Sequence, residues 1–144
     1  MSEILFICVA NIARSQMAEG FYNHYSKGKA ISAGVQDYRE KYNFRPYPGV
    51  VDVMAEKGID ISEQRIKLVN DELIANSEKI IIFIKENKCP ENFKEMLVNH
   101  PSVEYLEVED PCPGELTKEN YNEIVEKTRI ARDQIERIVV SFMK

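Results

Sequence analysis

The sequence predicts an α/β fold, a four-stranded parallel sheet with helices on both of its faces. Short apolar runs alternate along the chain with segments of helical periodicity, which is typical of parallel strands joined by right-handed crossovers. The 144 residues, 44% of them hydrophobic, suffice for one sizeable core. No repeat, low-complexity segment or linker interrupts the pattern. We therefore expect residues 1–144 to form a single domain.

Each expected element rests on its own local pattern. The apolar runs predict strands at residues 3–8, 29–33, 79–84 and 103–108. Helical spacing of apolar residues predicts helices at 14–25, 50–55, 70–75 and 90–99, and a long amphipathic helix from Thr117 onward. Gly34 closes the second strand, and Gly58 ends the second helix. In folds of this class, ligands bind beyond the carboxyl ends of the strands.

Composition and charge exclude several classes of function. The net charge of -5 gives no reason to expect a nucleic-acid or membrane partner. The apolar run ILFICVA is too short for a signal peptide or a membrane span. The three cysteines, at positions 8, 89 and 112, form no CxxC pair, and the two histidines are His24 and His100. We therefore expect a cytoplasmic protein without a disulfide scaffold, a metal site or a cofactor.

The loop after the first strand, CVANIARS, is the main candidate for chemistry. Backbone N–H groups of a turn that leads into a helix N-terminus bind anions. That positive potential and the Arg14 guanidinium favour a thiolate at Cys8, a nucleophile aimed at a bound oxyanion. Arg14 can hold two oxygens of this anion, and Ser15 can donate a hydrogen bond to the sulfur. Asn11 tolerates left-handed backbone and can bond across the loop.

The expected site therefore spans the whole loop. Cys8 and Arg14 are the candidate catalytic residues, and the candidate substrate-binding residues are Val9, Ala10, Asn11, Ile12, Ala13 and Ser15. The alternative is that Cys8 is a small buried hydrophobe and that Arg-Ser only opens a helix. The strand before the loop, the helix after it and the serine that follows the arginine favour the functional interpretation.

Phosphoryl transfer to sulfur needs a proton for the leaving oxygen, and a carboxylic acid can supply it. The candidate is Asp110 in EVEDPCPG, which follows the fourth predicted strand. Pro111 fixes a turn that can bring this carboxyl over the pocket. The alternative is that Asp110 forms an Asx turn at the end of the strand. The cysteine loop at the same sheet edge favours the catalytic role.

Four motifs in order, CVANIARS, SAG, GIDIS and EDP, resemble the low-molecular-weight protein tyrosine phosphatase family, which includes thioredoxin-linked arsenate reductases. This resemblance runs through nearly the whole chain and implies the flavodoxin-like architecture of the family. It also implies a two-step reaction: Cys8 attacks phosphorus, Asp110 protonates the leaving phenol, and water then hydrolyses a phosphocysteine. The implied substrates are phosphorylated proteins or small aryl phosphates, with phosphotyrosine foremost.

The sequence departs from the family pattern at two places. Many of these phosphatases carry a second cysteine before the loop arginine, where this chain has Ala13. They commonly place aromatic residues after the Asp-Pro pair, where this chain has Cys112 and Pro113. An aromatic wall for the substrate can instead come from four residues of the loop after the second strand: Tyr38, Tyr42, Phe44 and Tyr47.

Arsenate reduction with a thiol reductant is the alternative function. The reductases resolve an arseno-cysteine with a cysteine pair near the third strand. Cys89 matches the second member of that pair, and Ile84 or Lys85 stands in place of the first. Cys89 and Cys112 are thus the candidate resolving thiols, and we also hypothesise a reversible Cys8–Cys112 disulfide. The alternative for Cys112 is an unreactive turn cysteine.

Two readings from other classes are less favoured. A non-catalytic anion-binding module would need neither the nucleophile Cys8 nor the acid Asp110. A nucleotide-binding protein of flavodoxin type would need glycines in the loop, and CVANIARS has none.

Overall fold

The apolar runs of the sequence form one parallel sheet, as expected. The computed structural model describes residues 2–112 and 114–143. The strands are β1 (Ser2–Cys8), β2 (Ala30–Gly34), β3 (Ser77–Ile82) and β4 (Val103–Tyr105), and they are arranged in the order β2-β1-β3-β4. All three strand pairs are parallel. The predicted α/β class is confirmed.

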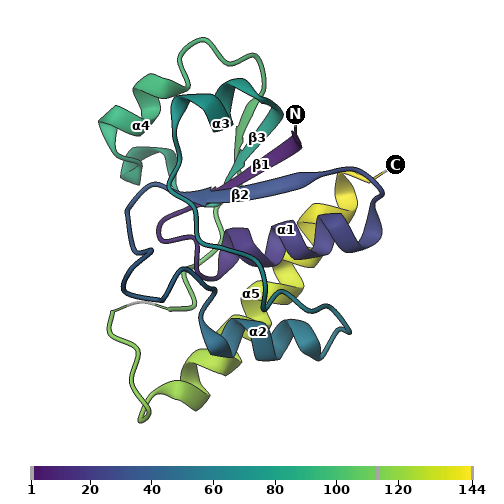
Figure 1. Cartoon of the computed structure of the whole chain (residues 1–144), viewed down its shortest axis with the longest axis vertical. Helices are drawn as coiled ribbons and strands as arrows, with labels where there is room; N and C mark the ends of the chain where they lie inside the picture. The colour runs from purple at the N-terminus through teal and green to yellow at the C-terminus, as the bar shows by residue number, and fades with distance from the viewer. Residues whose placement is uncertain (1, 113, 144) are drawn as a thin grey trace.

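Helices cover both faces of this sheet (Figure 1). One face carries α1 (Arg14–Tyr25), α2 (Pro48–Ala55) and α5 (Tyr121–Ser141), and the other carries α3 (Asp71–Ala75), α4 (Glu91–Met96) and the short 3₁₀ turn η1 (Glu86–Lys88). Side chains of β1 alternate between the faces because a strand has a period of two. Ile4 and Phe6 belong to the core cluster under α1, α2 and α5. Leu5 and Ile7 belong to the cluster under α3 and α4.

Two of the strands, β3 and β4, end earlier than the apolar pattern predicts, whereas β1 ends at Cys8 as predicted and β2 ends one residue later, at Gly34. β4 stops at Tyr105 rather than at residue 108, and β3 covers 77–82 rather than 79–84. The chain nevertheless continues alongside its neighbours: the Phe83 N–H donates to the Ile7 carbonyl at 2.9 Å, and the Val108 N–H donates to the Phe83 carbonyl at 3.1 Å. These bonds guide the chain toward Asp110 at the carboxyl edge of the sheet.

Two helices are also shorter than predicted. α4 ends at Met96 rather than at residue 99. α5 begins at Tyr121, because Thr117 and Asn120 bond to each other in a turn before the helix. In that turn the Thr117 N–H donates to Asn120 Oδ1 at 2.9 Å. Helix α1 spans the predicted range of 14–25.

The ends of β1 and β2 meet tightly beneath the loop. Gly34 is paired with Cys8 in the sheet register. A Cβ atom at Gly34 would lie 2.7 Å from the Val9 carbonyl oxygen, a contact that real side chains do not make. A residue without a side chain is therefore needed where β2 passes the start of the loop. None of the helices in residues 2–112 and 114–143 is long and apolar enough to cross a membrane.

Candidate active site

The loop between β1 and α1 offers a row of unused backbone donors. Within the described part of the chain, none of the N–H groups of residues 9–15 donates to a protein acceptor. Helix α1 begins at Arg14, and no side chain caps it. The first turn of a helix leaves N–H groups without intrahelical partners, and these attract anions. We call this row of donors at residues 9–15 the cradle, and donors arranged in this way can bind an oxyanion.

Cys8 lies at the base of this cradle with Ser15 beside it. The cysteine is the last residue of β1 and is 2% exposed. Its sulfur lies 2.9 Å from the Ser15 hydroxyl oxygen. A hydroxyl at this distance can donate to a thiolate and stabilise it, and it can stabilise the sulfur again as a leaving group.

Asn11 holds the loop in shape. Its backbone is left-handed, with a φ of 61°, and its side chain is fully buried. The amide nitrogen donates to Ser15 Oγ at 2.7 Å and to Ser32 Oγ at 2.9 Å. The amide oxygen accepts from the Lys67 N–H at 2.8 Å. These three side-chain hydrogen bonds hold the Asn11 backbone in the left-handed conformation that the loop requires.

A polar chain behind Asn11 was not predicted from the sequence. Ser32 on β2 donates to Glu19 Oε1 at 2.6 Å, and the Lys67 ammonium lies 3.7 Å from the same oxygen. Burial lowers the pKa of Lys67, and the charge of Glu19 opposes that shift. The one available sequence signal was Ser32, a polar residue within the buried strand AISAG. Its partners come from distant segments that no local pattern connects.

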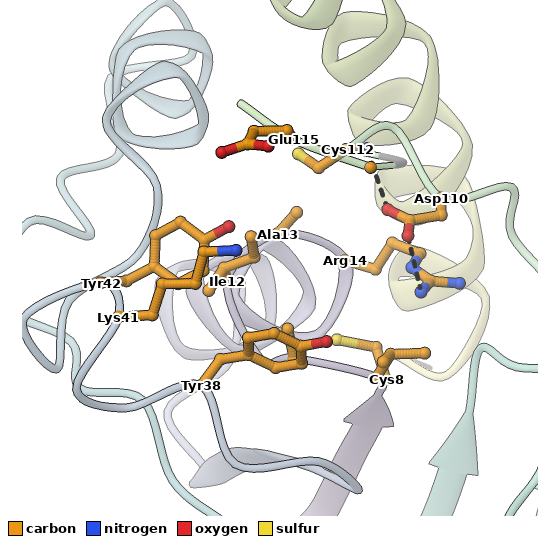
Figure 2. A pocket seen from close by; sticks show the side chains of 13 residues that line it. Cys8, Ile12, Ala13, Arg14, Tyr38, Lys41, Tyr42, Asp110, Cys112 and Glu115 are labelled. Carbon is orange, nitrogen blue, oxygen red and sulfur yellow. Dashed lines mark hydrogen bonds and ion pairs between the residues drawn. The ribbon is translucent and has the colours of Figure 1, made fainter. Parts of the chain in front are cut away.

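Arg14 and Asp110 meet at the edge of the cradle (Figure 2). Arg14 is 6% exposed, and its Nη1 donates to the carbonyls of Val108 at 2.9 Å and Phe83 at 3.3 Å. Its Nη2 lies 3.9 Å from Asp110 Oδ2. The two carbonyls orient the guanidinium from behind, so its other N–H groups remain for a ligand.

Asp110 forms the Asx turn and also lines the pocket. Its Oδ1 accepts from the Cys112 N–H at 2.9 Å, which is the Asx turn. Its Oδ2 faces Arg14, and the carboxyl lines the same pocket as Cys8. The Asx turn is therefore compatible with a carboxyl that faces the pocket, and the catalytic role of Asp110 stays a prediction.

The cradle forms the floor of a pocket of about 370 Å³. One wall comes from Tyr38, Lys41 and Tyr42, and Cys112 and Glu115 also line the pocket, above this wall in the view of Figure 2. Ile12 and Ala13 of the loop also line it. In residues 2–112 and 114–143, no three His, Cys, Asp or Glu side chains gather closely enough to hold a metal ion.

The four aromatic candidates for a wall divide into two pairs. Tyr38 and Tyr42 line the pocket, with ring centroids 6.4 Å apart. Phe44 lies against the Arg65 guanidinium, whose central carbon is 5.5 Å from the ring centroid. Tyr47 is buried in the core beside α2. Of these four described residues, only Tyr38 and Tyr42 line the pocket that contains Cys8.

The two further cysteines occupy different environments. Cys112 lines the pocket, and burial, with the negative charges of Asp110 and Cys8, raises the pKa of its thiol to about 12. Cys89 lies in the other core cluster, under α4, where its thiol donates to the Lys85 carbonyl at 3.5 Å. Burial raises its pKa as well. The pocket around Cys8 therefore includes Cys112 and does not include Cys89.

A four-stranded parallel sheet with a cysteine in an anion-binding loop defines a class of cysteine-dependent α/β enzymes. The chain belongs to the low molecular weight phosphotyrosine protein phosphatase family, whose sequence model matches residues 3–139. The curated relatives carry two kinds of name. An arsenate reductase of Shouchella clausii is 32% identical over 130 residues, which cover 88% of this chain and 86% of that protein. A probable low molecular weight protein-tyrosine-phosphatase of Ralstonia solanacearum is 30% identical over 119 residues, covering 75% and 77%.

Solved structures agree with the fold. An arsenate reductase in an oxidized state has a TM-score of 0.70 at 26% identity, with 98% of this chain and 95% of that chain covered. A YwlE arginine phosphatase has a TM-score of 0.71 at 18% identity, with coverage of 95% and 90%, and supports the fold alone. Relatives of both kinds share the architecture, so the activity has to be argued from the site.

Proposed function

We propose that this protein is a cysteine-dependent phosphatase that hydrolyses phosphomonoesters, with phosphotyrosine as its substrate class. The observation that carries the proposal is the row of unused N–H groups at residues 9–15 around the sulfur of Cys8. A phosphoryl group in this cradle would bind with its oxygens on the amides and on Arg14, and with phosphorus in front of the sulfur. The wall of Tyr38 and Tyr42 supports an aromatic leaving group, because rings stack well on tyrosine.

The proposed reaction has two steps. The Cys8 thiolate attacks phosphorus, the bond to the leaving oxygen breaks, and Asp110 gives that oxygen its proton. Water then attacks the phosphocysteine while the Asp110 carboxylate takes a proton from it, and Cys8 leaves as a thiolate stabilised by Ser15. Arg14 and the loop amides stabilise the charge on the equatorial oxygens in both transition states. No step calls for a cofactor.

Trapping the intermediate tests this mechanism. Acid quenching during turnover of an aryl phosphate should yield a peptide phosphorylated at Cys8, detected by mass spectrometry. The Cys8→Ser variant provides the control, since it should not release product. Release of phosphate without any modified Cys8 would mean that water attacks directly, and the two-step mechanism would be wrong.

Arsenate reduction is the second candidate, favoured by the names of the relatives at about 30% identity. The Cys8 thiolate would attack arsenic, one arsenic–oxygen bond would break, and that oxygen would leave as water after protonation. A second thiol would then attack the Cys8 sulfur and break its bond to arsenic. A disulfide would form, arsenite would leave with the electron pair, and an external dithiol would have to reduce the disulfide for the next turnover. Cys112 lines the pocket, but its raised pKa disfavours the attacking thiolate. The cysteine pair of the reductases is also incomplete here, since Ile84 or Lys85 stands in place of its first member, and for this reason we rank the phosphatase first.

Arsenite formation in the presence of a dithiol tests the second candidate. Under this alternative, Cys112→Ser should stop arsenite formation, whereas Cys89→Ser should not, because Cys89 lies outside the pocket. The same alternative predicts a peptide linking Cys8 to Cys112 after oxidation by peroxide or arsenate. If mass spectrometry finds no linked peptide, Cys112 is a structural thiol.

A further inference from the structure

The mouth of the pocket carries a positive charge that the proposed reaction does not use. Lys41 lines the pocket, and its Nζ lies 5.7 Å from the ring centroids of both Tyr38 and Tyr42. Among the described residues, no carboxylate lies within ion-pair distance of this ammonium. An ammonium on two aromatic faces is attracted to both rings, so its position is restricted even though the side chain is exposed.

The segment that carries these three residues is tightly bonded. The Tyr42 N–H donates to the Tyr38 carbonyl at 3.3 Å, and the Phe44 N–H donates to the Arg39 carbonyl at 2.7 Å. The Asp37 carboxylate is paired with Arg39 at 2.8 Å, so it is not a partner for Lys41. The ammonium is therefore held at the pocket by a structured turn.

The other charges around the pocket are placed asymmetrically. Arg14 lies at the floor and meets Asp110. Glu115 also lines the pocket and makes no ion pair with Lys41; in the view of Figure 2 it lies above Tyr42 and Lys41, on the side away from Asp110. An anionic group beside the bound phosphoryl would thus be attracted by the Lys41 ammonium and repelled by the Glu115 carboxylate. In a protein of net charge -5, an unpaired lysine at this place is a local attraction for a second anion.

We propose that Lys41 binds a second anionic group of the substrate, so that the preferred substrate is phosphotyrosine with an acidic residue beside it in a peptide. This inference rests on the proposed phosphatase function. In the bound state the phosphoryl group fills the cradle, the phenyl ring lies against Tyr38 and Tyr42, and a neighbouring Asp or Glu carboxylate meets the Lys41 ammonium. Exposed ion pairs contribute modestly, so we expect an effect of about two- to fivefold.

Two synthetic phosphotyrosine peptides test the proposal, one with Asp and Glu on both sides of the phosphotyrosine and one with Asn and Gln. The readout is the ratio of kcat/KM for the acidic peptide to that for the neutral one, at low ionic strength. Lys41→Gln should lower this ratio about two- to fivefold, Lys41→Arg should retain it, and Glu115→Gln should raise it. Lys29→Gln removes the same charge at the opposite end of the sheet and should leave the ratio unchanged.

An equal ratio in wild type and Lys41→Gln would overturn the inference even if both enzymes hydrolyse the peptides. If the wild type hydrolyses neither the peptides nor para-nitrophenyl phosphate, the proposed function itself fails. The affinity of Cys8→Ser for both peptides, measured by fluorescence anisotropy, examines Lys41 apart from turnover. In this background we compare how much more tightly the acidic peptide binds than the neutral one, with Lys41 and with Lys41→Gln. If the difference between the two peptides is the same in both proteins, the inference is also overturned.

Discussion

Replacing Asn11 by alanine tests whether the loop is held in shape by one buried side chain. Asn11 has a φ of 61°, and its amide oxygen accepts the Lys67 N–H at 2.8 Å. Alanine tolerates left-handed backbone less well, at about 1 kcal/mol. The Lys67 N–H would lose its partner, at about 1–3 kcal/mol. The sum predicts that Asn11→Ala lowers the free energy of unfolding by about 2–4 kcal/mol.

Activity should fall more than stability alone explains. A cradle displaced by about 1 Å costs on the order of 10²-fold in rate, so we expect kcat/KM for an aryl phosphate to fall about 10–100-fold in folded Asn11→Ala. Urea unfolding followed by circular dichroism gives the first quantity, and steady-state kinetics at 25 °C gives the second. Asn11→Gly separates the contributions, because glycine accepts the backbone but makes no side-chain bonds. Wild-type stability together with wild-type kcat/KM in Asn11→Ala would refute the role assigned to this residue.

Three further predictions follow from other parts of the structure. Asp110→Asn should slow phenyl phosphate hydrolysis about 10²–10⁴-fold and para-nitrophenyl phosphate hydrolysis less, because nitrophenolate needs a proton less; equal losses would contradict the acid role. Gly34→Ala should lower both the midpoint of urea unfolding and kcat/KM, because its Cβ would lie 2.7 Å from the Val9 carbonyl oxygen. Unchanged values would show that the loop backbone can move to accommodate the Cβ. Two arginines lower the pKa of Glu56 from 4.5 to about 2, so the melting temperature difference between wild type and Glu56→Gln should be full above pH 4.5 and shrink as the pH falls toward 2. A difference that grows on acidification would contradict that assignment.

The fold could be predicted because its determinants are local. The apolar strand ending at Cys8 and the helix opening at Arg14 lie within one short segment, and α1 covers the predicted residues. The predicted ends of the strands were less accurate than the predicted strands themselves, because hydrogen bonding to a neighbouring strand decides where a strand stops. Residues 106–108 have the apolar pattern of a strand, but β4 ends at Tyr105.

The site could be predicted only in part for the same reason. Cys8 and Arg14 share a loop, and Asp110 could be added because parallel strands end at one edge. Lys67 reaches Asn11 from 56 residues away, and no spacing rule links the two. The sequence also does not distinguish the environments of two nearby tyrosines. Tyr42 lines the pocket, whereas Tyr47 is buried in the core. Long-range contacts had to be seen before these residues could be assigned.

The central claim is that Cys8 is the nucleophile of a phosphatase, and one comparison tests it most directly. Steady-state hydrolysis of para-nitrophenyl phosphate at mildly acidic pH should be measured for wild type beside Cys8→Ser, with folding of both checked by circular dichroism. The account predicts many turnovers by the wild type and none above background by the variant. A folded wild type that binds phosphate but does not turn over the substrate would contradict the claim. A Cys8→Ser variant that still hydrolyses para-nitrophenyl phosphate would contradict it as well.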